Sequence, residues 1–188
     1  MTGKSILTTP LPETVVLADG TELAIRTDFR VGILFSAIRN DPMVSPASKR
    51  HLALRLYYES LPEKADPDEL FHAAMCFYSR ASEKGTEEDC PHTQQEPIFD
   101  FTVDGDRIYA AFYAAYGIDL CTARLHWWQF LALLVSLPRD SAFMRTVALR
   151  CMDPAEVTDD AARKRLRMAK ARVRIRSTSA ADRGEAAR

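Results

Sequence analysis

Two histidines and two cysteines are the first residues whose types and spacing could do chemistry. His72 and Cys76 lie four residues apart, one turn of the helix predicted there, so both side chains could face a zinc ion. Cys90 and His92 follow in a polar stretch typical of a loop, at a one-residue spacing that zinc fingers do not normally use. The spacing favours buried or unused side chains over a metal site, and we expect no metal and no other cofactor.

A cysteine nucleophile is a second possibility. Cys121 or Cys151 could be activated by His126, but neither lies on a glycine-flanked elbow that would expose it. The seven glycines form no phosphate-binding loop and no dinucleotide fingerprint. Acidic pairs occur at predicted helix starts, where the helix dipole accounts for them without catalysis: Asp104 with Asp106, and Asp159 with Asp160. We therefore expect a protein that is not an enzyme.

Charge is distributed unevenly along the 188 residues, although the net charge is −1. Residues 163–188 contain ten lysines and arginines against two acids, whereas the remaining 162 residues contain fifteen bases and twenty-four acids. The four cysteines are far apart, which favours free thiols and a reducing compartment over a disulfide framework. An acidic body with a basic end is the main compositional signal.

The basic end is predicted to form a helix over residues 158–176, with acids in its first turn and bases later, as the helix dipole favours. Its apolar residues are sparse: Ala162, Leu166, Ala169 and Val173. The candidate partner-binding residues are its cations: Arg163, Lys164, Arg165, Arg167, Lys170 and Arg172. No aromatic residue is interleaved among them to stack on bases, so a solvated face or an acidic protein surface is favoured over nucleic acid.

The run "LHWWQFLALLVSLP" predicts a helix that Thr122 caps and that ends before Pro138. Its apolar part spans roughly 20 Å, too short to cross a bilayer of about 30 Å, so we expect no membrane span. We interpret Trp127 and Trp128 as core residues, each indole N–H with one partner, with a partner contact as the alternative. Since neighbouring helical residues point about 100° apart, the two rings should not share one contact direction.

Turn and cap residues locate the other elements. Asp19-Gly20 lies between apolar runs and predicts a β-hairpin of residues 15–17 and 22–26, with both turn residues at positive φ. Helices are predicted from a cap at Thr27 or Asp28 to about Arg39, from Ser45-Pro46 to about Ser60, and from Asp66-Pro67 with Glu69 completing a capping box. Further helices are predicted from about Asp104 to Tyr116, after Asp140, and after Asp153-Pro154.

The expected fold class is therefore mostly α, a single helical domain with a short N-terminal β-hairpin and a basic C-terminal helix. Its parts are a flexible N-terminus (1–12), the helical core with the hairpin (13–157), the basic helix (158–176) and a disordered tail (177–188). The predicted buried stripes are Phe29, Ile33, Leu34 and Ile38 in the first helix and Phe71, Ala74, Met75 and Tyr78 in the third.

Five short motifs resemble one known family. They are "IYAAF", "YGIDL", "LHWWQFLALL", the spaced pattern "FM…R.MD" and "RKR", and the resemblance extends over residues 14–176, most strongly from Phe99 to Asp153. The family is the bacteriophage proteins called gene product fifteen, which are encoded among tail genes near the tape-measure gene. The acidic stretch "EKGTEEDCPHTQQEP" and the end after Arg176 depart from the family pattern, which leaves the details of partners open.

The resemblance implies a tail assembly chaperone, a non-enzymatic protein that binds the tape-measure protein in the host cytoplasm during phage assembly. It implies no catalytic residues. Other tail proteins or a second copy of the chain are further expected partners, whereas no membrane partner is expected. Two alternatives stay open: a structural component retained in the tail, and a nucleic-acid-binding regulator that uses the basic helix.

Overall fold

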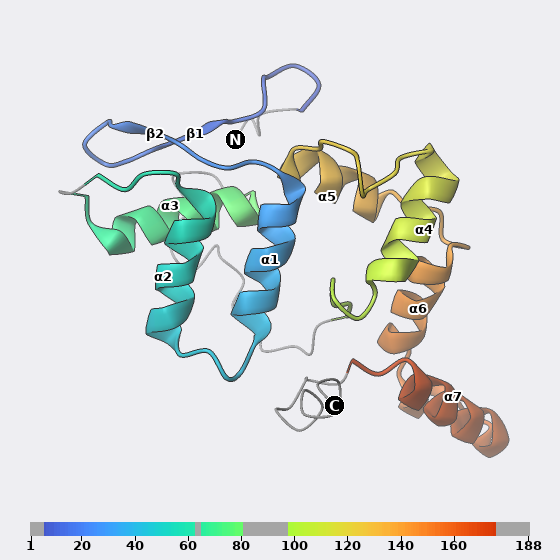
Figure 1. The fold of residues 1–188 in the computed structure, drawn as a ribbon. Coiled ribbons are helices and arrows are strands. Elements are labelled where there is room, and N and C mark those ends of the chain that lie inside the picture. Colours follow the sequence, from blue (N-terminus) through green and yellow to red (C-terminus); the bar gives the residue numbers. More distant parts are fainter. Residues whose placement is uncertain (1–5, 63–64, 81–97, 176–188) are drawn as a thin grey trace, which may run out of the picture. The chain divides into compact units, whose positions relative to one another are not determined.

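The computed structural model describes residues 6–62, 65–80 and 98–175 and divides the chain into two compact units (Figure 1). The first unit comprises residues 1–94 and 123–135, and the second comprises residues 95–122 and 136–188. Within the described residues, helices predominate and the strands form one two-stranded sheet. The predicted fold class, mostly α with a short N-terminal hairpin, is confirmed.

The hairpin opens the first unit. Its strands, β1 (Thr14–Val16) and β2 (Glu22–Ala24), are antiparallel. Gly20 has a φ of 86° as predicted, but Asp19 does not have a positive φ. The Gly20 N–H donates to the Leu17 carbonyl, and the Leu17 N–H donates to the Thr21 carbonyl. This pattern is a turn closed by a glycine bulge, so the predicted turn type was wrong at Asp19.

Three capped helices follow the hairpin. In α1 (Phe29–Asn40), α2 (Pro46–Tyr57) and α3 (Pro67–Ser79), the predicted cap side chains of Asp28, Ser45 and Asp66 accept hydrogen bonds from first-turn N–H groups. The predicted capping box was wrong at Glu69, because its carboxylate accepts from the Ala18 N–H of the hairpin turn instead of the Asp66 N–H. The helix starts are thus confirmed, while α2 ends three residues before the predicted Ser60.

The buried stripes of α1 and α3 are shifted from their predicted positions. Leu34 is 54% exposed, whereas Phe35 is 1% exposed. The shift arises because α1 packs against both α2 and α5, which centres its buried side between these two neighbours. In α3 Ala74 is buried as predicted, but Phe71, Met75 and Tyr78 are half-buried. The buried residues are Phe29, Gly32, Phe35 and Ser36 in α1, and Leu70, Ala74, Cys76 and Phe77 in α3.

Helix α5 (Trp127–Val135) begins five residues after the predicted cap, Thr122. The Thr122 hydroxyl is instead bonded to the Asp119 carboxylate at 3.2 Å. His126 pairs antiparallel with Asp28, and the Trp127 N–H donates to the Thr27 carbonyl at 2.7 Å. The predicted start was wrong because residues before Trp127 satisfy their backbone groups against the chain entering α1, which leaves them extended.

The two tryptophans meet the same end of α3. The Trp127 indole N–H donates to the Tyr78 carbonyl and the Trp128 indole N–H to the Phe77 carbonyl, both at 2.8 Å. Their rings stack on the side chains of the same two residues, at centroid distances of 5.2 Å for Trp127–Tyr78 and 5.7 Å for Trp128–Phe77. One partner for each indole N–H is confirmed. The expectation that the rings could not share a contact direction was wrong, because long side chains from adjacent residues can reach adjacent carbonyls.

Close packing holds α5 against α1. A Cβ atom added to Gly32 would lie 2.4–2.7 Å from carbon atoms of the Trp127 ring, so the ring fills the space that a larger residue would need. Trp127 is 2% exposed and Phe130 is fully buried, which confirms the core interpretation for Trp127, whereas Trp128 is only half-buried. Val135, however, is 75% exposed, so the expectation of an apolar helix covered all round was wrong.

The second unit contains α4 (Gly105–Tyr116), α6 (Ala142–Cys151), the short 3-10 helix η2 (Pro154–Glu156) and α7 (Asp160–Arg172). Helix α4 ends as predicted at Tyr116, and its C-cap is Gly117, whose φ is 66°. Helix α6 is capped by Ser141 rather than by the predicted Asp140. Helix α4 packs against α6, and α7 packs against α6 and η2.

The predicted boundaries of the parts do not coincide with the two compact units, and the division at 13–157 and 158–176 stays a prediction. Helix α7 is shorter than the predicted basic helix, since it starts at Asp160 and ends at Arg172. The tail at 177–188 lies outside the described residues, as do residues 1–5 of the N-terminus. Of the helices in the described ranges, none has both the length and the apolar character that crossing a bilayer requires.

Candidate functional site

The candidate site is helix α7, which carries all six predicted partner-binding residues. The Asp159 carboxylate caps the helix by accepting from the Ala162 N–H at 2.6 Å. Asp160 lies in the first turn, and Lys170 and Arg172 in the last, so charges complement the helix dipole at both ends. The sparse apolar residues of this segment are half-buried and lie on one side, which we call the inner side of the helix: Ala162, Leu166, Ala169 and Val173.

Two of the six cations are held within the second unit. Arg163 donates from Nε to the Val157 carbonyl at 3.0 Å and forms an ion pair with Asp160 at 2.6 Å. Lys170 donates from Nζ to the carbonyl of Met152, which is the C-cap of α6. These two side chains therefore fasten α7 to the segment that precedes it.

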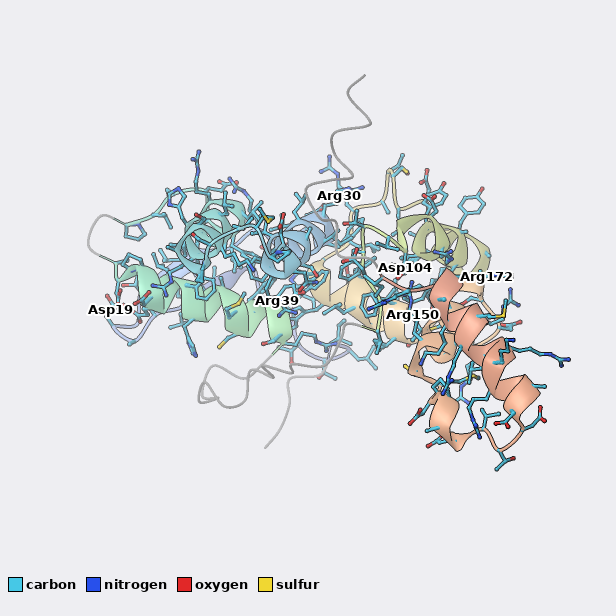
Figure 2. All side chains as sticks on the ribbon, turned by 90° about the horizontal axis from the view of Figure 1, so that it is seen from below. Asp19, Arg30, Arg39, Asp104, Arg150 and Arg172 are labelled. Atoms are coloured by element: carbon cyan, nitrogen blue, oxygen red, sulfur yellow. The ribbon has the colours of Figure 1, made fainter. Side chains whose placement is uncertain are left out.

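A buried ion pair secures the C-terminal end of α7. Arg150 on α6 binds the Asp104 carboxylate with two hydrogen bonds of 2.6 and 2.9 Å, and its Nε donates to the Val173 carbonyl at 2.6 Å. The Asp104 side chain is fully buried and the Arg150 side chain is 9% exposed. Figure 2 shows Asp104 and Arg150 pointing toward each other near Arg172 at the end of α7. The position of α7 thus depends on Asp104, for which the sequence predicted only a role at the start of a helix.

The charge of Asp104 is retained despite its burial. Burial by itself would raise the pKa of this carboxyl. Hydrogen bonds from Arg150 and from the Asp100 N–H oppose it, together with the charges of Arg150 and Arg107, and they hold the pKa below its usual value. The pair is therefore ionised at neutral pH and keeps Arg150 directed at both α4 and α7.

The other four cations face outward. Lys164, Arg165, Arg167 and Arg172 are exposed, and no hydrogen bond or ion pair joins their side chains to the rest of the described chain. Met168 lies between them and is 56% exposed, four residues after Lys164 and four before Arg172. We call these five residues the outer face of α7. Helical spacing alone indicates that Met168 lies on this face, since it is one turn from both Lys164 and Arg172.

The remaining candidates do not assemble a chemical centre in the described residues. The Cys76 sulfur lies 3.8 Å from each ring nitrogen of His72, so the two residues do share one side of α3, while Cys90 and His92 lie outside the described residues. Among the residues described, no group of three or more potential ligands could hold a metal ion.

His126 is occupied by backbone groups. Its Nδ1 accepts from the Trp128 N–H and its Nε2 donates to the Pro12 carbonyl, both at 3.0 Å. Since Nδ1 accepts, the proton lies on Nε2 and neither nitrogen is left to activate a thiol. The geometry assigns this histidine to capping α5 and holding the N-terminal segment.

Comparison with known proteins gives one family. A family model described as Bacteriophage Gp15 protein matches residues 7–175. No curated protein and no solved structure matches the chain. The matched residues include most of each compact unit and all of α7.

Proposed function

Because this chain belongs to the bacteriophage Gp15 family, we propose that it is a non-enzymatic protein of phage tail morphogenesis that binds the tape-measure protein as a chaperone. It acts in the host cytoplasm while tails are being assembled. The tape-measure protein is a long helical chain with apolar stripes that stay uncovered until the tail tube forms around it. A helical partner can cover such stripes by packing helix against helix.

The observation that carries the binding role is the outer face of α7. Four cations and an exposed methionine stand on one side of a helix whose other side is fastened to its own unit. Rigid presentation lowers the entropic cost of binding.

Co-expression with the tape-measure protein tests the proposal. We expect the tape-measure protein to become soluble and to co-purify with this chain. If its solubility is unchanged and nothing co-purifies, the chaperone role is wrong.

Mass spectrometry of purified virions separates the chaperone from a retained tail component. A chaperone is released during assembly, so its peptides should be missing from virions that contain the tape-measure protein. Stoichiometric recovery of this chain would favour the structural alternative.

A further inference from the structure

We infer that the outer face of α7 binds an acidic amphipathic helix of a protein partner, with Met168 covering an apolar residue of that helix. The inference rests on the proposed function in taking the tape-measure protein as the natural source of the helix. It adds the chemistry of the binding segment: carboxylates spaced by one helical turn on both sides of an aliphatic residue.

Charge complementarity is the first argument. Lys164 and Arg167 are three residues apart, so like charges are neighbours on the helix surface, an arrangement that disfavours the free helix. Arg163 shows that an acid one turn away can neutralise a cation in this same helix, through Asp160. Asp160 also lies one turn before Lys164, but no acid lies one turn from Arg165, Arg167 or Arg172. A partner with carboxylates at matching spacing would supply the opposing charges that these three arginines lack on their own helix.

Met168 is the second argument, and it favours a protein over nucleic acid. A flexible thioether side chain packs well against the varied aliphatic residues of a helical partner. A phosphate backbone would gain nothing by covering it, and the outer face has no aromatic ring on which a base could stack.

The size and ends of the face are the third argument. From Lys164 to Arg172 it extends about 12 Å, which is two turns of a helix and matches a short helical segment. Asp159 and Asp160 stand at its N-terminal end, and the Asp160 side chain is 91% exposed. Their negative charge would repel a phosphate backbone that continues past the face, whereas a short helix can end before it.

The experiment measures binding of fluorescein-labelled peptides to the full-length protein by fluorescence anisotropy, at 50 and 200 mM NaCl. The probe is a synthetic helical peptide with a central leucine and glutamates one turn before and after it. Its two comparators carry serine in place of the leucine, or glutamine in place of every glutamate. A 20-base-pair DNA duplex is the fourth ligand.

The protein variants are Met168→Ser and the double variant Arg165→Ser/Arg167→Ser. Met43→Ser and Arg55→Ser are the controls, since Met43 is 68% exposed and Arg55 is exposed, both in the first unit.

We expect the glutamate peptide to bind and the glutamine peptide not to bind. Met168→Ser should weaken the leucine peptide about fivefold at both salt concentrations, because the lost burial of a half-exposed apolar side chain is insensitive to salt. The same substitution should change binding of the serine peptide less than twofold, which identifies a direct contact between Met168 and the leucine. Met43→Ser and Arg55→Ser should change neither.

Three results would overturn the inference: no binding of the glutamate peptide, an equal effect of Met168→Ser on both peptides, or tighter binding of DNA than of the peptide. Four phosphate contacts predict that binding to DNA falls about 150-fold between the two salt concentrations, regardless of Met168.

The inference about this face and the proposed function can fail independently of each other. If the peptides behave as expected but the tape-measure protein does not co-purify, the tape-measure role fails alone. If the tape-measure protein co-purifies equally with Met168→Ser and Arg165→Ser/Arg167→Ser, the assignment of this face fails alone.

Discussion

The C-terminal end of α3 in the first unit and the C-terminal ends of α6 and α7 in the second unit are satisfied by different donors. Carbonyl groups at the end of a helix lack intrahelical partners. In the first unit, the indole N–H groups of Trp127 and Trp128 serve the end of α3. In the second unit, Lys170 and Arg150 serve the C-caps of α6 and α7. Charged donors also occur in the first unit, since Lys49 donates to the Arg39 carbonyl at the end of α1 and Arg26 donates to the Arg55 and Leu56 carbonyls at the end of α2. The difference lies in what accompanies the donor: the indoles add buried aromatic stacking at the end of α3, whereas Arg150 at the end of α7 is also ion-paired with the buried Asp104.

The largest expected effect is on the second unit. Arg150→Met leaves the fully buried Asp104 carboxylate without its main partner and should lower the free energy of unfolding by about 3 kcal/mol. Arg107→Met is the matched control: Arg107 lies 3.3 Å from the same carboxylate but is 41% exposed, so it should cost under about 1 kcal/mol. Urea unfolding followed by circular dichroism, with hydrogen exchange of α7, measures both. Equal costs for the two variants would mean that Arg150 is not the principal support of α7.

The next effect concerns the first unit. Gly32→Ala forces the Trp127 ring to move and should cost about 1–3 kcal/mol. Gly105→Ala is the control, because a Cβ there meets no atom within 4 Å, and it should be neutral or slightly stabilising. Both tryptophans lie in the first unit, so tryptophan fluorescence reports its unfolding directly. An unchanged fluorescence midpoint for Gly32→Ala would show that the α1–α5 contact is not tightly packed.

Two adjacent tyrosines, Tyr57 at the end of α2 and Tyr58 at its C-cap, differ in whether their buried hydroxyl groups are hydrogen-bonded. The buried Tyr58 hydroxyl donates to the Leu70 carbonyl at 2.9 Å, whereas the buried Tyr57 hydroxyl has no hydrogen-bond partner among the described residues. Tyr58→Phe should therefore cost about 1 kcal/mol, and Tyr57→Phe should be neutral or stabilising. Thermal unfolding of the two variants compares them, and a larger loss for Tyr57→Phe would contradict the hydrogen-bond assignment.

The smallest expected effect is on the pH dependence of the free energy of unfolding, which differs between His126 in the first unit and Asp104 in the second. Burial lowers the pKa of His126 from 6.5, opposed by its hydrogen bond to Pro12 and the charge of Glu13. A lowered pKa in the folded state means that this stability is complete above pH 6.5 and declines as the pH falls below it. The pKa of Asp104 is lowered from 3.8, so its contribution is complete above that value and is lost at lower pH.

Unfolding free energies measured from pH 8 to pH 3 test both windows. His126→Gln should flatten the decline that begins near pH 6.5, and Asp104→Asn should flatten the part below pH 4. A decline near pH 6.5 that is the same in His126→Gln would assign it to another group.

Local signals in the sequence predicted much of this fold. Asp28, Ser45-Pro46 and Asp66-Pro67 marked helix starts because their capping chemistry is short-range. Tertiary packing decided the rest. The buried side of α1 depends on having neighbours on two sides, and the late start of α5 depends on pairing with the chain before α1, to which no local signal points.

The candidate site was predictable only in part. The sequence identified the six cations of α7, but it could not distinguish Arg163 and Lys170, which bind nearby carbonyls, from the four that face outward. Asp104 resembled an ordinary first-turn acid, because its burial depends on Arg150, which is 46 residues away. Long-range ion pairs of this kind leave no spacing pattern in a single sequence.

We propose that this chain binds the tape-measure protein through the outer face of α7, and co-purification of the two proteins is the direct test. The wild-type chain, Arg165→Ser/Arg167→Ser and the control Arg55→Ser are each co-expressed with the tape-measure protein and recovered under identical conditions. We expect strong recovery with the wild type and Arg55→Ser, and a loss of about tenfold with the double variant, for two charged contacts at roughly 0.7 kcal/mol each. Equal recovery with all three chains would contradict it.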